Sequence, residues 1–255
     1  MIITSTIENP IVPFQNKIHL AVQKLVKSAH PDFYSTRPIL SGSYLIKLLV
    51  APQAYFSDYD FYFESQEKYN QAKTMLLERN SLVYSNTNCD TFALPQSNLH
   101  LQIINTYFGT PTEIISKHDI ENVKVAYQND SLFFTKKFLQ LWIEGKLSLD
   151  TFQIDDLKTP KTKYLSFVST LFRIKKYIDR YDLELDEKTI SMLFDLKKHF
   201  NQNIATYSNF KTLSSQDNVS YHSPEFQLSD YESVDFLLNT LINFSTPEFP
   251  EPIEF

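Results

Sequence analysis

Two residue types are scarce in this chain of 255 residues, and each scarcity excludes a class of protein. Its only glycines are Gly42, Gly109 and Gly145, too few for the glycine-rich loop of a Rossmann dinucleotide site or for a P-loop. Its one cysteine, Cys89, excludes an internal disulfide and a cysteine-rich zinc site, and it fits a reducing compartment. We therefore expect a cytoplasmic protein without Rossmann or P-loop nucleotide chemistry.

Long apolar runs and an excess of positive charge are also missing. No stretch of about 18 apolar residues occurs, and the start MIITSTIENP lacks the cationic and apolar regions of a signal peptide. The net charge of −6 does not favour a protein that coats duplex nucleic acid. Charge is nevertheless uneven, because residues 124–180 hold eleven Lys and Arg against six acids, whereas residues 212–255 hold eight acids and no Lys or Arg.

Apolar periodicity predicts an α+β fold that is followed by an all-helical half. The predicted helices span 14–29, 44–50 and 65–80, and the predicted strands span 37–41, 55–63, 82–84, 91–94 and 99–107. A helical pattern, broken near Gly145 and Pro160, runs from 112 to about 203. The last two strands, separated by Pro95-Gln-Ser-Asn, predict a hairpin. We expect an α+β domain at 1–120, a helical domain at 121–206, and an acidic linker with a C-terminal helix and tail at 207–255.

The tail carries an apolar stripe from Val234 to Ile242 beside its acidic residues. Exposure of such a stripe is costly, so we expect it to pack on the protein itself or on a partner. In one alternative the stripe is an ordinary terminal helix. In the other the acids cover a basic face of the chain and compete with an anionic ligand.

The most informative pattern joins a glycine turn to a pair of acids. Gly42 and Ser43 separate a predicted strand from a predicted helix, and such a turn offers backbone N–H groups and a hydroxyl to a phosphate. Asp58 follows Ser43 by fifteen positions, and Asp58 and Asp60 stand two apart on a strand, so they share one face. Paired carboxylates of this kind bind Mg²⁺ together with the phosphates of a nucleotide.

This pattern, from Ile39 to Phe63, resembles the polymerase-beta-type nucleotidyltransferase superfamily, which places Gly-Ser on a turn before Asp-x-Asp. Weaker resemblance to nucleotidyltransferase-like proteins of phages and large DNA viruses covers Leu101-Gln-Ile-Ile, Pro111 to Ile120 and Arg173 to Arg180. The resemblance implies transfer of a nucleoside monophosphate from an NTP to an acceptor hydroxyl, with Mg²⁺ or Mn²⁺ bound by Asp58 and Asp60. It does not imply the acceptor.

One departure from the superfamily concerns its third carboxylate, which lies on a later strand. The corresponding strand here reads Leu99-His-Leu-Gln-Ile-Ile, so His100 or Gln102 occupies the place. Asp119, in the pair His118-Asp119, is the candidate for the missing acid. A site with two carboxylates can also bind nucleotide without turning it over.

A basic helix face supplies the last candidates. Residues 163–180 place Leu171, Ile174 and other apolar residues on one side and Arg173, Lys176 and Arg180 on the other. The basic side is either a solvated face or a surface that binds the outer phosphates of the nucleotide through Arg173 and Lys176.

Two hypotheses follow. The first is an Mg²⁺-dependent nucleotidyltransferase in which Asp58, Asp60 and Asp119 are catalytic, with Asp119 or His100 on the acceptor side. In it Gly42, Ser43, Arg173 and Lys176 bind the NTP, and the acceptor is a protein, an RNA or a small molecule. The second is a catalytically inactive binding or structural protein of a phage, viral or bacterial assembly that keeps the fold. The missing third acid and the acidic tail favour the second.

Overall fold

The computed structural model describes residues 2–5, 12–53, 58–95, 99–150, 160–202 and 241. The chain divides into two compact units, Met1–Glu144 and Gly145–Phe255, and each is considered by itself. The predicted linker and terminal helix at 207–255 lie outside the described residues, apart from the buried Leu241. Among the described residues, no helix combines the length and the apolar character that crossing a membrane requires.

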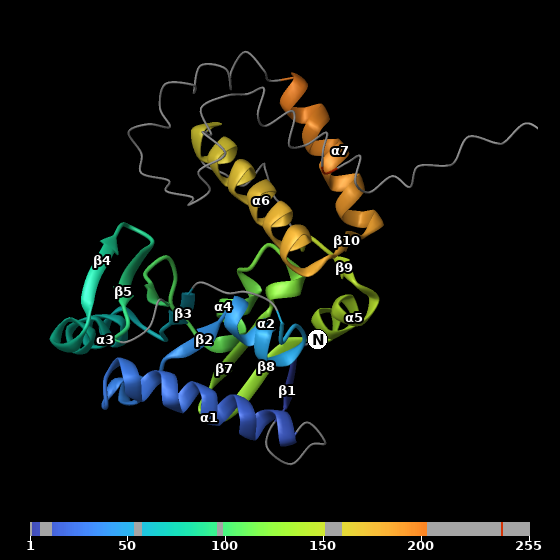
Figure 1. Ribbon diagram of the computed structural model, residues 1–255. Helices are drawn as coiled ribbons and strands as arrows, with labels where there is room; N and C mark the ends of the chain where they lie inside the picture. Colours follow the sequence, from blue (N-terminus) through green and yellow to red (C-terminus); the bar gives the residue numbers. More distant parts are fainter. Residues whose placement is uncertain are drawn as a thin grey trace, which may run out of the picture. The chain divides into compact units, whose positions relative to one another are not determined.

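The first unit is built on a mixed eight-stranded sheet with the order β1-β8-β7-β2-β3-β6-β5-β4 (Figure 1). β3 and β6 pair in parallel, and the other neighbours pair antiparallel. The strands are β1 (Ile2–Ser5), β2 (Ile39–Ser41), β3 (Asp58–Tyr62), β4 (Ser81–Ser85), β5 (Cys89–Ala93), β6 (His100–Ile104), β7 (Val125–Gln128) and β8 (Ser131–Thr135). This sheet and its helices confirm the predicted α+β class.

The helices of this unit follow the predicted apolar spacing. They are α1 (Val12–Ala29), α2 (Ser43–Leu49), α3 (Gln66–Arg79), α4 (Pro111–Ser116) and α5 (Lys136–Glu144), with 3₁₀ turns at η1 (Phe33–Thr36) and η2 (Glu121–Val123). The predicted inner face of α1 is buried, since Ile18, Val22 and Val26 are almost inaccessible to solvent. The predicted cap of α3 is also present, because the Ser65 hydroxyl accepts a hydrogen bond from the Lys68 N–H.

The helical pattern expected from residue 112 onward is wrong over residues 125–135. These residues form the β7–β8 hairpin, whose turn residues Asn129 and Asp130 both have positive φ, at 47° and 61°. Two consecutive residues with positive φ are typical of a type I′ hairpin turn. Asn and Asp adopt positive φ more readily than most other residues. The sheet therefore continues beyond residue 120, the expected end of the first domain.

β1 was not predicted. It is an edge strand that pairs with β8, with Ile2 opposite Thr135 and Ser5 opposite Leu132. A strand of four residues has too little alternation to stand out in the sequence, and its partner is distant along the chain.

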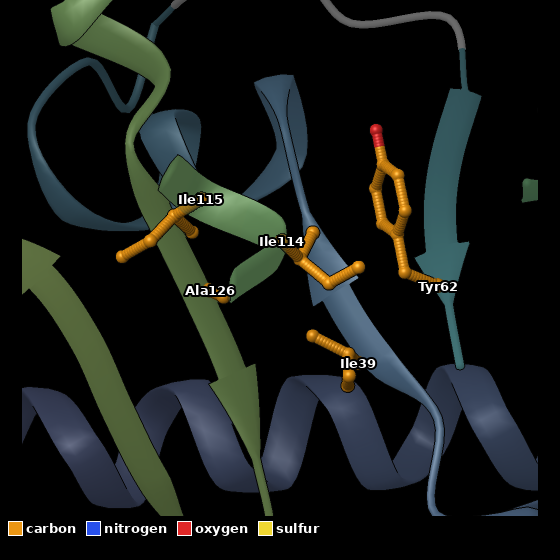
Figure 2. Close-up of a cluster of buried hydrophobic side chains, with 5 residues drawn as sticks. All are labelled: Ile39, Tyr62, Ile114, Ile115 and Ala126. Atoms are coloured by element: carbon orange, nitrogen blue, oxygen red, sulfur yellow. The ribbon is translucent and has the colours of Figure 1, made fainter. Parts of the chain in front are cut away.

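A small apolar cluster fixes α4 against the sheet. Ile114 and Ile115 of α4 pack with Ile39 of β2, Tyr62 of β3 and Ala126 of β7, and Figure 2 shows where these side chains lie on the four elements. The helix starts with a capping box, in which the Thr110 hydroxyl accepts from the Glu113 N–H and the Glu113 carboxylate accepts from the Thr110 N–H. As a result, the residues that follow α4 lie close to β2 and β3.

Over its described residues the second unit includes the helices α6 (Pro160–Tyr181) and α7 (Glu187–Gln202), together with the short parallel strands β9 (Lys146–Leu147) and β10 (Glu184–Leu185). Leu171 and Ile174 of α6 are fully buried, as the amphipathic pattern predicts. The pattern extends toward Tyr164, Phe167 and Val168, whose side chains lie outside the described residues. The unit is mainly helical, as predicted.

Candidate functional site

The glycine turn lies where it was predicted, between β2 and α2. Gly42 adopts φ 85° and ψ −156°, a backbone region that is essentially restricted to glycine. Ser43 is the first residue of α2 and is nearly buried.

The two acids of β3 share one face, as their spacing predicts. Asp58 and Asp60 are half-buried and alternate with the buried Tyr59 and Phe61. Phe61 points into the core, where its ring lies 5.4 Å from that of Phe33 in an edge-to-face arrangement. The core residues therefore fix β3 so that both carboxylates lie on the opposite face, which we call the acid face.

The turn and the second acid are in direct apposition. Ser41 pairs with Asp60 across the antiparallel β2–β3 ladder, and Gly42 follows at the end of β2. A Cβ atom placed on Gly42 would lie 2.6 Å from the Asp60 Oδ2. Only a glycine leaves room for the carboxylate at this position, so Gly42 is required both by its backbone conformation and by the position of Asp60.

The strand beside β3 does not carry a third acid. In the parallel register of β3 and β6, His100 lies opposite Asp58 and Gln102 lies opposite Asp60. Both are half-buried, and paired residues of neighbouring strands point to the same side of a sheet. The acid face therefore presents an imidazole and an amide at the place where the superfamily resemblance implies a carboxylate.

Cys89 and Thr91 of β5 extend the acid face by one more strand, with Thr91 paired with Gln102. Burial raises the pKa of the Cys89 thiol, and the carboxylates of Asp60, Asp90 and Asp58 raise it further, while a hydrogen bond with Thr91 opposes the shift. The thiol is thus protonated at neutral pH, and the negative charge of the two β3 acids contributes to its raised pKa.

Sequence reasoning identified His118 only by its neighbour Asp119, and the structure gives it contacts on the acid face. The His118 Nε2 lies 3.3 Å from the Ser41 Oγ. Its ring packs edge-on against Tyr62 at a centroid distance of 5.9 Å, and Tyr62 in turn stacks on Tyr107. Tyr62 could have been anticipated, because it continues the period-two spacing of Asp58 and Asp60.

Asp119 is half-buried in the turn that follows α4, immediately after His118 in the chain. Its assignment as the third acid stays a prediction. Arg173 and Lys176 belong to α6 of the second unit, where Arg173 is half-buried with its Nη2 3.2 Å from the Thr170 Oγ1 and Lys176 is exposed. Their assignment to the outer phosphates also stays a prediction.

The carboxylates fit a metal ion that is bound together with a nucleotide. Within the described residues no group of three or more His, Cys, Asp or Glu side chains could hold a metal ion. Asp58 and Asp60 alone supply two carboxylates, which suits Mg²⁺ or Mn²⁺ because such ions complete their octahedra with water and substrate phosphate oxygens. The donor set thus matches an ion that arrives with an NTP.

Comparison with known protein families identifies the chain. Residues 2–142, more than half of its length, match the model of a family described as Gabija anti-defense 2 family protein. The chain belongs to the Gabija anti-defense 2 family. The matched region contains the whole eight-stranded sheet and every residue of the acid face. A comparison of the chain with curated proteins found no match.

Solved structures show which fold this family member has. A CCA-adding enzyme in complex with ATP superposes with a TM-score of 0.54 at 15% sequence identity, covering 80% of this chain and 48% of the enzyme. The complex with CTP gives a TM-score of 0.51 at 14% identity, with 82% and 46% covered. The chain thus spans about half the length of these structures. The likeness shows a nucleotidyltransferase fold, in agreement with the predicted class.

Proposed function

We propose that this chain counters Gabija defence as a nucleotidyltransferase, by moving a nucleoside monophosphate from an NTP to a hydroxyl group of an acceptor. The observation that carries the proposal is the apposition of Gly42 and Asp60, with Asp58 on the same strand face. This arrangement places a glycine turn, whose N–H groups suit a phosphate, beside two carboxylates of the kind that bind a metal ion. Two further observations support it: the fold is shared with CCA-adding enzymes whose structures contain ATP and CTP, and the chain's family is named for anti-Gabija activity.

Each predicted site residue has a role in this proposal. Asp58 and Asp60 bind the metal ion that accompanies the NTP, and the N–H groups and hydroxyl of Gly42 and Ser43 contact its phosphates. When bound, Mg²⁺ or Mn²⁺ neutralises phosphate charge and orients the phosphates for displacement. Asp119 is the candidate acid on the acceptor side. Arg173 and Lys176 are candidates for binding the outer phosphates through their positive charge.

The acceptor is proposed as a hydroxyl group on a component of Gabija defence, whether protein, RNA or small molecule. Nucleotidylation adds a bulky group and a negative charge to its target, and a charge introduced at a functional surface disrupts binding there. A single enzyme could inactivate many target molecules in this way. The family name supports the target, and the fold supports the chemistry.

A specific observation favours a second candidate function. Gln102 lies opposite Asp60, where a third carboxylate is implied, and an amide cannot accept a proton from the acceptor hydroxyl. The alternative is a protein that retains the fold and binds nucleotide or a Gabija component without turnover. Such a protein would act by occupying its target, in a stoichiometric ratio.

Isothermal titration with the four NTPs, with and without Mg²⁺, tests binding at the acid face. Incubation of the protein with α-³²P-labelled NTPs and purified Gabija components, followed by gel analysis, tests transfer. The proposal predicts a labelled acceptor that is absent when Asp58→Ala replaces the wild type. Metal-dependent NTP binding with no labelled acceptor, together with inhibition only at a one-to-one ratio, would instead establish the non-catalytic alternative.

A further inference from the structure

The solvent side of α1 carries lysines and no acid. The helix contains no Asp or Glu, although the chain as a whole has 30 acidic residues against 24 basic ones. Lys17, Lys24 and Lys27 are exposed, and Leu20, which lies among them, is 57% exposed. These positions have the spacing i, i+3, i+7 and i+10, which places them on one side of a helix over about 15 Å. We call these four residues the lysine ridge.

The charge of the ridge is not neutralised by neighbouring acids. Within the described part of the chain, none of its three lysines makes an ion pair or a hydrogen bond. Two carboxylates do come close to α1, but each is paired with a histidine. Asp130 of the β7–β8 turn pairs with His19, and Glu78 of α3 pairs with His30, which follows α1 in the chain.

A ridge of this kind differs from an ordinary solvated helix surface. Such surfaces usually mix charges of both signs, as α3 does by exposing Glu67 and Arg79. On α1, Lys24 and Lys27 are neighbours on the helix surface and repel each other. An anionic partner would remove this repulsion, so the ridge is suited to binding one.

The ridge lies on the side of the sheet opposite the acid face. The His19 Nδ1 of α1 lies 2.9 Å from the Tyr127 Oη, and Tyr127 pairs with Leu40. The next residue, Ser41, points to the other side of the sheet, where it pairs with Asp60. Figure 1 shows α1 as the long blue helix that runs beside β7 and β8. A partner on the ridge therefore leaves the acid face open to NTP.

We infer that the lysine ridge docks on an acidic surface of a protein component of Gabija defence; this rests on the proposed function, in either its catalytic or its stoichiometric form. The three lysines attract carboxylates of the partner and mainly accelerate association. Leu20 supplies an apolar contact surrounded by charge, as at the centre of protein interfaces. A nucleic acid backbone would engage the lysines but would leave Leu20 without an apolar partner.

The test measures binding of the full chain to each purified Gabija protein by surface plasmon resonance, at about 50 and about 300 mM KCl. The wild type should bind about tenfold more weakly at the higher salt, because salt screens exposed charges. The triple variant Lys17→Gln, Lys24→Gln, Lys27→Gln should bind about tenfold more weakly at low salt and should depend less on salt. Glutamine favours helix nearly as well as lysine, so urea denaturation should show an unchanged fold.

Two further variants separate the ridge from general charge. The triple variant Lys68→Gln, Lys136→Gln, Lys198→Gln removes the same charge from lysines spread over α3, α5 and α7, and it should bind within about twofold of the wild type. Leu20→Gln should weaken binding by about fivefold at both salt concentrations, because an apolar contact is not screened. Asp58→Ala should bind like the wild type, since docking does not use the acid face.

Equal binding by the ridge variant and its lysine control would overturn the inference. A ridge variant that keeps Gabija binding but no longer binds a labelled RNA or DNA of about 20 nucleotides would overturn it too, and would assign the ridge to nucleic acid. If the wild type labels an acceptor yet binds no Gabija protein, this inference fails while the proposed function stands. Docking through the ridge without any labelled acceptor supports the inference and removes only the catalytic form of the function.

Discussion

Gly42 and Asp60 are so closely apposed that the hydrogen atom of the glycine is the only side chain the site admits. A Cβ on Gly42 would lie 2.6 Å from the Asp60 Oδ2, well inside the distance at which non-bonded atoms repel. The identity of residue 42 therefore determines where the carboxylate of residue 60 can lie. A substitution at one position acts on the chemistry of the other.

Replacement of Gly42 by alanine should damage both stability and transfer. The alanine would have to adopt φ near 85° and displace Asp60, and we expect a loss of about 2–3 kcal/mol in the free energy of unfolding. Label transfer should fall by about 100-fold or more, because the metal-binding carboxylate moves. Chemical denaturation and single-turnover assays measure the two effects.

Gly145→Ala is the matched control for this substitution. Gly145 also has a positive φ, at 65°, but a Cβ there would meet no atom within 4 Å. The control should lose only about 1 kcal/mol and should transfer at the wild-type rate. If both alanine variants lost transfer equally, the apposition with Asp60 would not be the cause.

Asp58→Ala should abolish transfer while the protein stays folded. Asp58 is half-buried on the acid face and is not part of the core, so its removal should change the free energy of unfolding by less than about 1 kcal/mol. Titration of Mg²⁺ in the presence of NTP should show weakened binding in the variant. A variant that still labels the acceptor at the wild-type rate would contradict the role of Asp58.

Asp90 should make the protein sensitive to acid. Its carboxylate is 1% exposed, and it accepts hydrogen bonds from Tyr69 and Ser85 and lies 2.7 Å from the Lys73 Nζ. Burial alone would raise the pKa of Asp90, but the hydrogen bonds from Lys73, Ser85 and Tyr69 outweigh it, so the pKa is lowered overall.

Because the folded state binds this proton more weakly than the unfolded state, the stabilisation by Asp90 is complete above the unfolded pKa of about 3.9 and is lost as the pH falls through the lower folded pKa. Asp90→Asn should therefore cost about 2–3 kcal/mol at pH 7 and should flatten the dependence of stability on pH in acid. Urea denaturation between pH 3 and 7 measures this. Glu67→Gln, an exposed acid at the start of α3, serves as the control.

Cys89 should react slowly with alkylating reagents in the folded protein. Burial and then the carboxylates of Asp60, Asp90 and Asp58 raise the pKa of its thiol, which lowers the thiolate fraction at pH 8. Asp60→Asn removes one of these charges and should accelerate alkylation by iodoacetamide severalfold. The rate is read by intact mass. An unchanged rate in Asp60→Asn would show that the charge of Asp60 does not control the thiol.

The sequence predicted the parts of the site that depend on local spacing. Period-two alternation placed Asp58 and Asp60 on one face, and Gly42 was identified by its position between a predicted strand and a predicted helix. The contact between His118 and Ser41 was not predictable, because it joins residues 77 positions apart through the packing of α4. The β7–β8 hairpin was misread as helix because its turn residues, Asn129 and Asp130, were not recognised as a hairpin signal.

The topology of the sheet also determines when the first unit can fold during synthesis. Ile2 pairs with Thr135, so β1 has no partner until β8 has been synthesised. At about 5–20 residues per second, β1 waits on the order of ten seconds. Closing so long a loop also makes β1 a late step of refolding. The nascent chain should therefore acquire protease resistance only after β8 has emerged.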